Sequence, residues 1–239
     1  MPEPIDLPEL KPAPLDPGTL YLVATPIGNM EDITLRAIRT LRDCDLVAAE
    51  DTRHTGMLLK RLGLAKRQVS THKFNEAKRS GEIVELLQGG GTVSMVSDAG
   101  SPGISDPGHR LVTAAIEAGC RVETVPGACA LVAALTASGL ATNEFHFVGF
   151  LPVKSGQRAK RLAMLLELPG TLALYESPYR VVKLLGELAE VAPDRPVVLA
   201  RELTKKFEQI QRGVAAELLA AYSERKPKGE FVVLIGRAE

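Results

Sequence analysis

TVSMVSDAGSPGISDPG, residues 92–108, is the stretch that decides the fold. Its first six residues are small, apolar or β-branched, which predicts a buried strand over 92–97. The loop that follows begins at Asp98 and holds three glycines and two prolines, and a helical spacing resumes at Leu111. A strand, a glycine-rich loop and a helix in succession indicate an α/β fold, in which ligands collect beyond the carboxyl ends of the strands.

The same alternation extends in both directions from this stretch. In the first half, strands are predicted at 19–24, 46–50, near 70 and at 122–125, and helices at 34–43, through Leu58 and Leu62, at 76–87, at 111–118 and after Gly127. In the second half, strands are predicted at 145–150, 171–177, 196–200 and 231–236, and helices at 157–166, 179–190 and 214–222. A further segment near Gln209 is a candidate edge strand, which would make the second sheet mixed. We predict two tightly packed α/β lobes, with domains at 18–127 and 128–239 after a mobile proline-rich arm at 1–17.

Composition bounds the possible functions. Lysine plus arginine equals aspartate plus glutamate, at 29 each in 239 residues, so a nucleic-acid partner would have to be bound by a local basic patch. The arm lacks the features of a signal peptide, and no apolar run is long enough to span a membrane. Cys44, Cys120 and Cys129 form no CxxC pair, which indicates reduced core thiols and a cytoplasmic protein.

Three loops are candidates for carrying chemistry. TPIGN (25–29) follows the first strand, and either allows close backbone approach to a ligand or is a plain turn. In the 98–108 loop, Asp98 is suited to receive ribose hydroxyls or an amine, unless the loop is only a compact turn, while Asp106 and Pro107 are predicted to start a helix. EDTRHT (50–55) positions a substrate or forms a solvated helix start.

Several common sites are disfavoured. Neither a GxGxxG fingerprint nor a Walker phosphate loop is present, which argues against an ordinary NAD or ATP enzyme. The histidines do not have the spacing of a metal site, so no metal is predicted; they are His54, His72, His109 and His146.

Taken together, seven segments resemble the ribosomal RNA small subunit methyltransferase I family, within the tetrapyrrole methylase (class III methyltransferase) superfamily. The segments are LYLVATPIGNMEDITLRAIRTL, AAEDTRHTGMLL, VSDAGSPGISDPG, VPGACALVAAL, GFLPVKSGQR, YESPYRV and ARELTKKFE, in order from Leu20 to Gly236. The resemblance implies a homodimer of two-domain chains with S-adenosylmethionine between the lobes. It also implies methyl transfer to the ribose 2′-oxygen of a cytidine in the decoding region of 16S ribosomal RNA.

The resemblance further assigns residues to the expected cofactor wall. These are Asp98, Ala99, Gly100, Pro126, Gly127, Ala128, Phe150, Leu151, Leu199 and Ala200, with Pro26 and Gly28 on the substrate side. Members of the family often carry an extra helical segment after the last strand, whereas this sequence ends at Glu239. We therefore expect RNA binding to rely on the body of the protein and on a dimer partner.

The mechanism leaves the proton acceptor open. Lys205 is the candidate general base, provided that desolvation lowers its pKa; the alternative is that Lys205 and Lys206 only contact phosphates. Glu50 and Arg53 are its rivals, and Arg53 is better suited to clamp a phosphate because it stays charged. Two basic runs are candidate RNA contacts, or else solvated helix faces: Lys154, Arg158, Lys160 and Arg161, and Arg53, Lys60, Arg61, Lys66 and Arg67.

Two other functions remain open from the sequence. The first is methylation of a tetrapyrrole or another small molecule on the same fold. The second is a non-enzymatic module that only binds S-adenosylmethionine. One scaffold can host several activities, so the fold by itself does not separate these.

Overall fold

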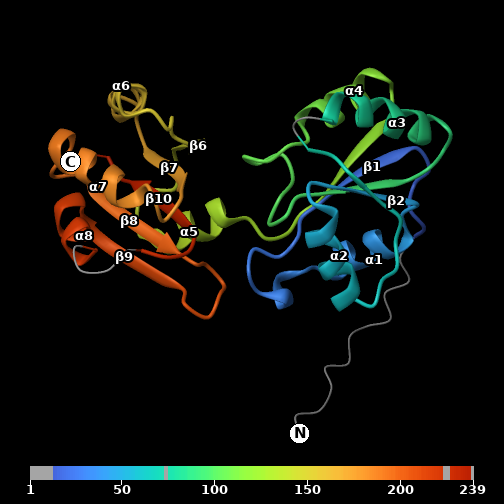
Figure 1. Ribbon diagram of the computed structural model, residues 1–239, viewed down its shortest axis with the longest axis horizontal. Helices are drawn as coiled ribbons and strands as arrows, with labels where there is room; N and C mark the ends of the chain where they lie inside the picture. The colour runs from blue at the N-terminus through green and yellow to red at the C-terminus, as the bar shows by residue number, and fades with distance from the viewer. Residues whose placement is uncertain (1–12, 73–74, 223–226, 238–239) are drawn as a thin grey trace, which may run out of the picture. The chain divides into compact units, whose positions relative to one another are not determined.

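The computed structural model describes residues 13–72, 75–222 and 227–237, which fall into two compact α/β units (Figure 1). Unit 1 consists of Met1–Val23, Leu35–Asp98 and Pro107–Val125. Unit 2 consists of Ala24–Thr34, Ala99–Asp106 and Pro126–Glu239. The predicted fold class is confirmed. The predicted domain boundary at residue 127 stays a prediction, since two loops from the first half of the chain are counted with unit 2.

Unit 1 is built on a five-stranded parallel sheet in the order β3-β2-β4-β1-β5. Its strands are β1 (Thr19–Val23), β2 (Leu46–Ala49), β3 (Gln68–Ser70), β4 (Val93–Val96) and β5 (Arg121–Val125). The helices α3 (Glu76–Gln88) and α4 (His109–Glu117) cover one face, and α1 (Leu35–Asp43) and α2 (Thr52–Arg61) lie on the other (Figure 1). Because both faces are covered, every residue of β2 and β4 is buried, which explains their lack of polar alternation.

The strand order of unit 1 contains a switch point between β4 and β1. From β1 the chain crosses over β4 to reach β2, and from β4 it crosses β1 to reach β5. The two connections therefore run in opposite directions. Loops that leave neighbouring strands at such a point are where ligands of open α/β sheets bind.

Unit 2 contains a mixed sheet in the order β6-β7-β10-β8-β9. Its strands are β6 (Phe145–Phe150), β7 (Thr171–Glu176), β8 (Pro196–Arg201), β9 (Gln209–Val214) and β10 (Phe231–Ile235). Its helices are η1 (Met30–Asp32), α5 (Ala130–Ser138), α6 (Ser155–Leu166), α7 (Val181–Val191) and α8 (Ala215–Ala221). The pairing of β6 with β7 is parallel and the other pairs are antiparallel, so the sheet is mixed. Because β9 is the last strand in the order, the predicted edge strand near Gln209 is confirmed.

The side chains of the second sheet alternate between two cores, as the pleat of a strand requires. Leu172, Leu174 and Leu199 pack on the face covered by α6, α7 and α8. Ala173, Val198 and Ala200 pack on the opposite face against α5. Because of this alternation, only the predicted site residues on the α5 face can offer a side chain to a ligand near α5.

The predicted start of α4 is wrong. The residue that caps the helix is Gly108, with φ 135°, and not Asp106. The carboxylate of Glu76, at the start of α3, accepts hydrogen bonds from the backbone N–H groups of Gly108 and Arg110 at 3.0 and 3.1 Å. A buried acid from another helix thus supplies the acceptor that the sequence assigned to a local aspartate.

The described end of the proline-rich arm is held to unit 1 rather than free. Arg39 donates to the carbonyl oxygen of Ala13 at 3.2 Å, and the backbone N–H of Asp16 donates to the Tyr21 hydroxyl at 2.8 Å. Arg121 forms an ion pair with Asp16. Residues 13–17 thus make contacts with unit 1, while the mobility of the arm stays a prediction and its first twelve residues lie outside the described chain.

All three cysteines are free, in agreement with the predicted reduced thiols. Cys44 is buried, whereas Cys120 and Cys129 are half-buried and pack against the edges of the two cores, in agreement with the expectation of core thiols. Within the described ranges, the helices are all too short or too polar to cross a bilayer.

Candidate active site

Two of the loops that the sequence singled out, TPIGN and residues 99–106 of the 98–108 loop, meet the segment that leads into α5 in unit 2. The third, EDTRHT, lies in unit 1. Thr25 and Gly100 form an isolated antiparallel bridge, with N–H to O distances of 2.9 and 3.0 Å. The hydroxyl of Ser101 donates to the carbonyl oxygen of Ala128 at 3.3 Å. The TPIGN loop and the loop 99–106 are therefore tied by backbone hydrogen bonds, and the loop 99–106 is tied to the segment that leads into α5 by the Ser101 hydroxyl.

Two glycines allow these loops to pack closely against one another. Gly100 has φ 83°, and a Cβ at this position would lie 3.2 Å from Ile27 Cγ2. A Cβ at Gly127 would lie 3.0 Å from the Cβ of Ala24. Ala99, Pro126 and Gly127 are exposed. The junction therefore presents peptide groups and small side chains at the surface, which suits a polar ligand that is recognised by the backbone.

The carboxyl ends of β6, β7 and β8 lie at the same edge of the second sheet, because these three strands run parallel to one another. Phe150, Glu176 and Glu202 mark this edge. The Phe150 ring is 55% exposed and makes an edge contact with Tyr175, at 5.9 Å between centroids, while the Arg180 guanidinium lies 5.9 Å from its centre. Burial raises the pKa of Tyr175 to about 12, so its hydroxyl is neutral at physiological pH.

Two arginine–glutamate pairs hold the segment that follows Phe150. Arg180 bonds the Glu176 carboxylate at 2.6 Å and donates to the carbonyl oxygen of Leu151 at 3.1 Å. Arg158 makes two bonds to Glu187, at 2.7 and 2.6 Å, and donates to the carbonyl oxygen of Val153 at 3.1 Å. The GFLP segment is thereby fixed from both sides by charge-assisted hydrogen bonds.

The place of Arg158 corrects one sequence prediction. Its side chain is only 3% exposed and donates three hydrogen bonds to Glu187 and Val153, so it does not face solvent or an RNA phosphate in this structure. The other members of that basic run are Lys154, Lys160 and Arg161, and all three are exposed. In the second run, Arg53, Lys60, Arg61 and Arg67 are exposed and Lys66 is half-buried.

Two residues of the expected cofactor wall point away from the junction. Leu151 is 3% exposed and Leu199 is fully buried, and both side chains belong to the core beneath α6 and α7. They can offer only backbone atoms to a ligand. Ala200 lies on the other face, in the cluster to which Ile27 and Cys129 also belong, and so remains on the side of the loops.

Lys205 does not meet the condition set for a general base. Burial by itself lowers its pKa, but ion pairs with Glu230 at 2.8 Å and Glu202 at 2.9 Å outweigh this and raise the pKa above the ordinary lysine value. Lys205 is therefore protonated at neutral pH. We therefore correct its assignment from general base to a structural residue. Its two ion pairs connect the loop after β8 to the start of β10.

The loop after β8 is conformationally strained. Glu202 and Thr204 are non-glycine residues with φ of 50° and 65°, a region that costs of order 1–3 kcal/mol per residue. A Cβ at Gly28 would lie 2.9 Å from Thr204 Oγ1 and would collide with the side chain of Lys205. Gly28 is thus required by the packing of the TPIGN loop against this segment.

The EDTRHT cluster of unit 1 is a helix start. The Asp51 carboxylate caps α2 by accepting from the backbone N–H of Arg53 at 2.8 Å, and it also pairs with the Arg53 guanidinium at 2.6 Å. The bond from Arg53 holds the pKa of Asp51 well below its usual value. Asp98 accepts the backbone N–H of Asp51 at 3.2 Å and so links the ends of β4 and β2. The side chain of Arg53 is 89% exposed, and Glu50 is half-buried.

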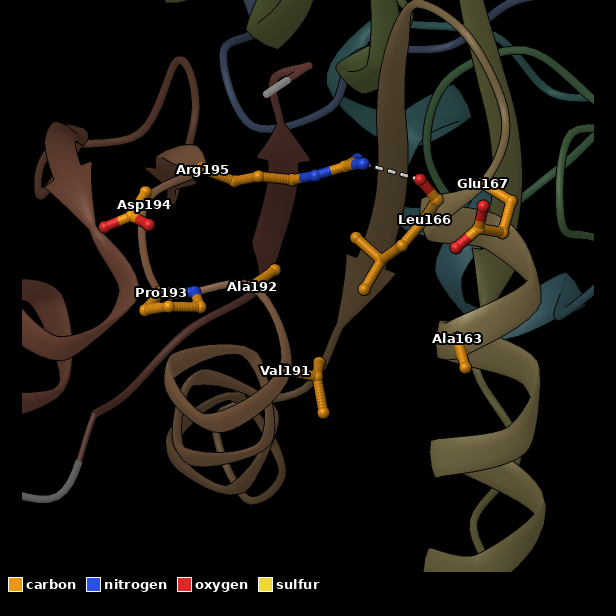
Figure 2. A pocket seen from close by; sticks show the side chains of 8 residues that line it. All are labelled: Ala163, Leu166, Glu167, Val191, Ala192, Pro193, Asp194 and Arg195. Carbon is orange, nitrogen blue, oxygen red and sulfur yellow. Dashed lines mark hydrogen bonds between the residues drawn. The ribbon is translucent and has the colours of Figure 1, made fainter. Parts of the chain in front are cut away.

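A separate pocket of about 310 Å³ lies at the opposite end of the second sheet (Figure 2). Its lining comes from the end of α6 and from the connection between α7 and β8, next to the starts of β7 and β8: Ala163, Leu166, Glu167, Val191, Ala192, Pro193, Asp194 and Arg195. Arg195 crosses it and donates to the carbonyl oxygen of Leu166 at 2.6 Å. No residue of the junction contributes to this lining, so the pocket is not the predicted ligand site.

Tyr175, Arg180 and Glu202 are not among the site residues predicted from the sequence, although each lies in a segment quoted for the family resemblance. The available signal was position, because Tyr175 lies near the end of the strand predicted at 171–177, and Arg180 and Glu202 follow predicted strands of the second half. The partners Glu187 and Glu230 gave no such signal, since they lie 29 and 25 residues from the cations that they pair with.

Comparison with known proteins is consistent with this arrangement. Residues 19–219 match the tetrapyrrole (corrin/porphyrin) methylase family. A protein of Mesorhizobium japonicum named ribosomal RNA small subunit methyltransferase I is 48% identical over 97% of this chain and 79% of its own length. A protein of the same name from Synechocystis is 48% identical over 92% of this chain and 80% of its own length.

Among solved structures, uroporphyrin-III C-methyltransferase of Thermus thermophilus, complexed with S-adenosylhomocysteine, superposes with a TM-score of 0.63 at 23% identity, covering 91% of this chain and 97% of that one. This likeness concerns the fold. The two named relatives are 48% identical to this chain over most of both sequences, which is about twice the identity of the solved structure. This chain belongs to the tetrapyrrole methylase family and, within it, to the ribosomal RNA small subunit methyltransferase I family.

Proposed function

We propose that this protein is an S-adenosylmethionine-dependent methyltransferase whose acceptor is the ribosomal RNA of the small subunit. The observation that carries the proposal is the junction of the TPIGN loop, the loop 99–106 and the start of α5 in a member of this family. The relatives' names supply the acceptor class, and the S-adenosylhomocysteine bound to the uroporphyrin-III C-methyltransferase supplies the cofactor class.

The residues present fit such a cofactor. Gly100 and Gly127 bring backbone close to backbone, and the exposed peptide groups of Ala99 and Gly127 suit the polar ends of an amino-acid nucleoside. Phe150 offers an exposed ring beside the junction, because a Cβ at Gly149 would lie 2.8 Å from Ser105 Oγ in the loop 99–106. In this proposal the wall retains Asp98, Ala99, Gly100, Pro126, Gly127, Ala128, Phe150 and Ala200, with backbone atoms only from Leu151 and Leu199.

When bound, the cofactor supplies an electrophilic methyl group, so the protein's main work is orientation. Positioning of this kind contributes up to about 7–11 kcal/mol in favourable cases. The ribose hydroxyl must also lose its proton, and Glu50 is the remaining candidate acceptor now that Lys205 is held protonated. Arg53, charged and 89% exposed, is assigned to a phosphate of the substrate.

The finer features follow from the family. The proposed product carries a methyl group on the 2′-oxygen of a cytidine in the decoding region of 16S ribosomal RNA. Pro26 and Gly28 form the substrate side, and Lys154, Lys160 and Arg161 contact phosphates. The proposed assembly is a homodimer in the cytoplasm, where its three free cysteines stay reduced.

The proposal is tested by incubating the purified protein with labelled S-adenosylmethionine and three acceptors: small ribosomal subunits, free ribosomal RNA and a tetrapyrrole. Mass spectrometry of the nucleosides then identifies the methylated position. We expect label in the RNA of the subunits. Label in the tetrapyrrole alone would establish the small-molecule alternative, and cofactor binding without transfer to any acceptor would establish a non-enzymatic module.

A further inference from the structure

The RELTKKFE segment ends in a feature that cofactor binding does not use. Phe207 stands in the connection between β8 and β9 with 65% of its surface exposed, and the Lys206 ammonium lies 5.7 Å from the centre of its ring. Lys206 is itself exposed and makes no ion pair with any residue in the described part of the chain. Phe207 thus presents a large part of an aromatic ring beside an ammonium group at the surface, two residues before β9 begins.

The loop holds its shape before any partner arrives. Lys205 is tied to Glu202 and Glu230, and the backbone N–H of Thr204 donates to the carboxylate of Glu208. The backbone N–H of Glu208 donates to the carbonyl oxygen of Lys205 at 3.0 Å. A loop that is ordered in the free protein loses less conformational entropy on binding than a flexible one.

The position of the loop connects it to the proposed substrate side. Leu203, Thr204 and Lys205 are the residues that a Cβ at Gly28 would meet, so this loop packs against the TPIGN segment. Phe207 lies two residues beyond this contact. A group bound by Phe207 would therefore lie beside the loop that faces the acceptor in the proposed function.

We infer that Phe207 stacks on an unpaired nucleobase of the RNA substrate and that Lys206 binds the adjoining phosphate. A ring beside an ammonium is the combination that binds single-stranded RNA, because every base has a face to stack on and every nucleotide carries a negative phosphate. A protein partner would call for a contiguous apolar patch, whereas the residues on either side of Phe207 in the sequence, Lys206 and Glu208, are charged and exposed. This inference rests on the proposed RNA acceptor.

The test uses the full chain with Phe207→Ala, Phe207→Leu, Phe207→Trp and Lys206→Ala. Phe145→Ala is the control for loss of an exposed phenylalanine, and Lys183→Ala is the control for loss of an exposed lysine. Three quantities are measured: affinity for a short fluorescein-labelled single-stranded RNA, KM and kcat with small ribosomal subunits, and calorimetric affinity for S-adenosylmethionine. Light scattering reports the oligomeric state of each variant.

We expect Phe207→Ala and Phe207→Leu to weaken RNA affinity and to raise KM by about tenfold or more, with kcat and cofactor affinity unchanged. Phe207→Trp should restore affinity, and Lys206→Ala should weaken it and lower its salt dependence. The inference is overturned by unchanged RNA affinity in Phe207→Ala, by rescue with leucine, which would indicate apolar packing, or by a changed oligomeric state, which would make Phe207 a subunit contact. If the wild-type protein binds the RNA oligonucleotide but methylates no RNA, the proposed function is contradicted and the inference about Phe207 is not.

Discussion

Lys205 illustrates how the partners of a single residue set its chemistry. A general base must be deprotonated near the working pH, and two carboxylates hold this lysine in its charged form. Its folded pKa lies above the ordinary lysine value of about 10.5, so the stabilisation from these pairs is fully present below that value and is lost as pH rises through the folded pKa.

We therefore expect Lys205→Arg to retain most of the methyltransferase activity, because arginine keeps the charge and the two pairs but cannot act as a base. Lys205→Met should lower thermal stability, since it leaves Glu202 without its cation. Activity and melting temperature are measured for both variants and the wild type across neutral to alkaline pH. Loss of turnover in a folded Lys205→Arg variant, with cofactor binding intact, would return the lysine to the mechanism.

Gly28 is the second residue whose role is set by a neighbour. Gly28→Ala places a methyl group 2.9 Å from Thr204 Oγ1 and against Lys205, and overpacking of this kind costs about 1–3 kcal/mol. The free energy of unfolding in urea should fall by this amount. The matched control is Gly186→Ala in α7, where the added Cβ meets no atom within 4 Å and alanine favours the helix. Equal effects of the two changes would refute the packing argument.

At the scale of elements, α3 and α4 are joined by one carboxylate. Glu76→Ala removes the acceptor for the N–H groups of Gly108 and Arg110, and we expect a loss of about 0.5–2 kcal/mol in the free energy of unfolding. Glu76→Gln keeps an acceptor oxygen and should recover part of that loss. Glu85→Ala, at an exposed position of the same helix, provides the baseline. Chemical denaturation measures all three, and no difference between positions 76 and 85 would contradict the capping role.

The pair between α6 and α7 should be more costly to break. Arg158→Met leaves the Glu187 carboxylate without its partner, and removal of one member of a buried pair costs about 3–5 kcal/mol. Because Glu187 keeps 20% exposure, the lower end of that range is expected. The double variant Arg158→Met, Glu187→Met should recover much of the loss. Arg161→Ala, an exposed neighbour, controls for loss of charge on α6, and a similar small effect at both arginines would disprove the clamp.

At the scale of the whole molecule, the balanced charge of 29 basic and 29 acidic residues limits long-range attraction to RNA. In the proposed function, RNA binding then relies on local contacts by exposed cations such as Lys154, Lys160 and Arg161. We expect affinity for small ribosomal subunits to fall as salt rises, with a slope of about 0.7–0.9 per phosphate contacted. Filter binding at several salt concentrations measures it, and cofactor calorimetry in the same buffers should stay nearly flat. Salt-independent binding of the subunits would exclude the basic patches.

The sequence by itself determined the order and type of the elements, including the edge strand β9, and the loops that form the junction. Hydrophobic periodicity and the conformational limits of glycine and proline are local properties, so they can be seen without the fold. Only the tertiary structure decided that Arg158 is buried, that Glu76 rather than Asp106 supplies the acceptor at the start of α4, and that Lys205 is held charged. Burial and pKa depend on groups brought close in space, and Glu187 and Glu230 come from distant positions in the chain that no local pattern connects to their partners.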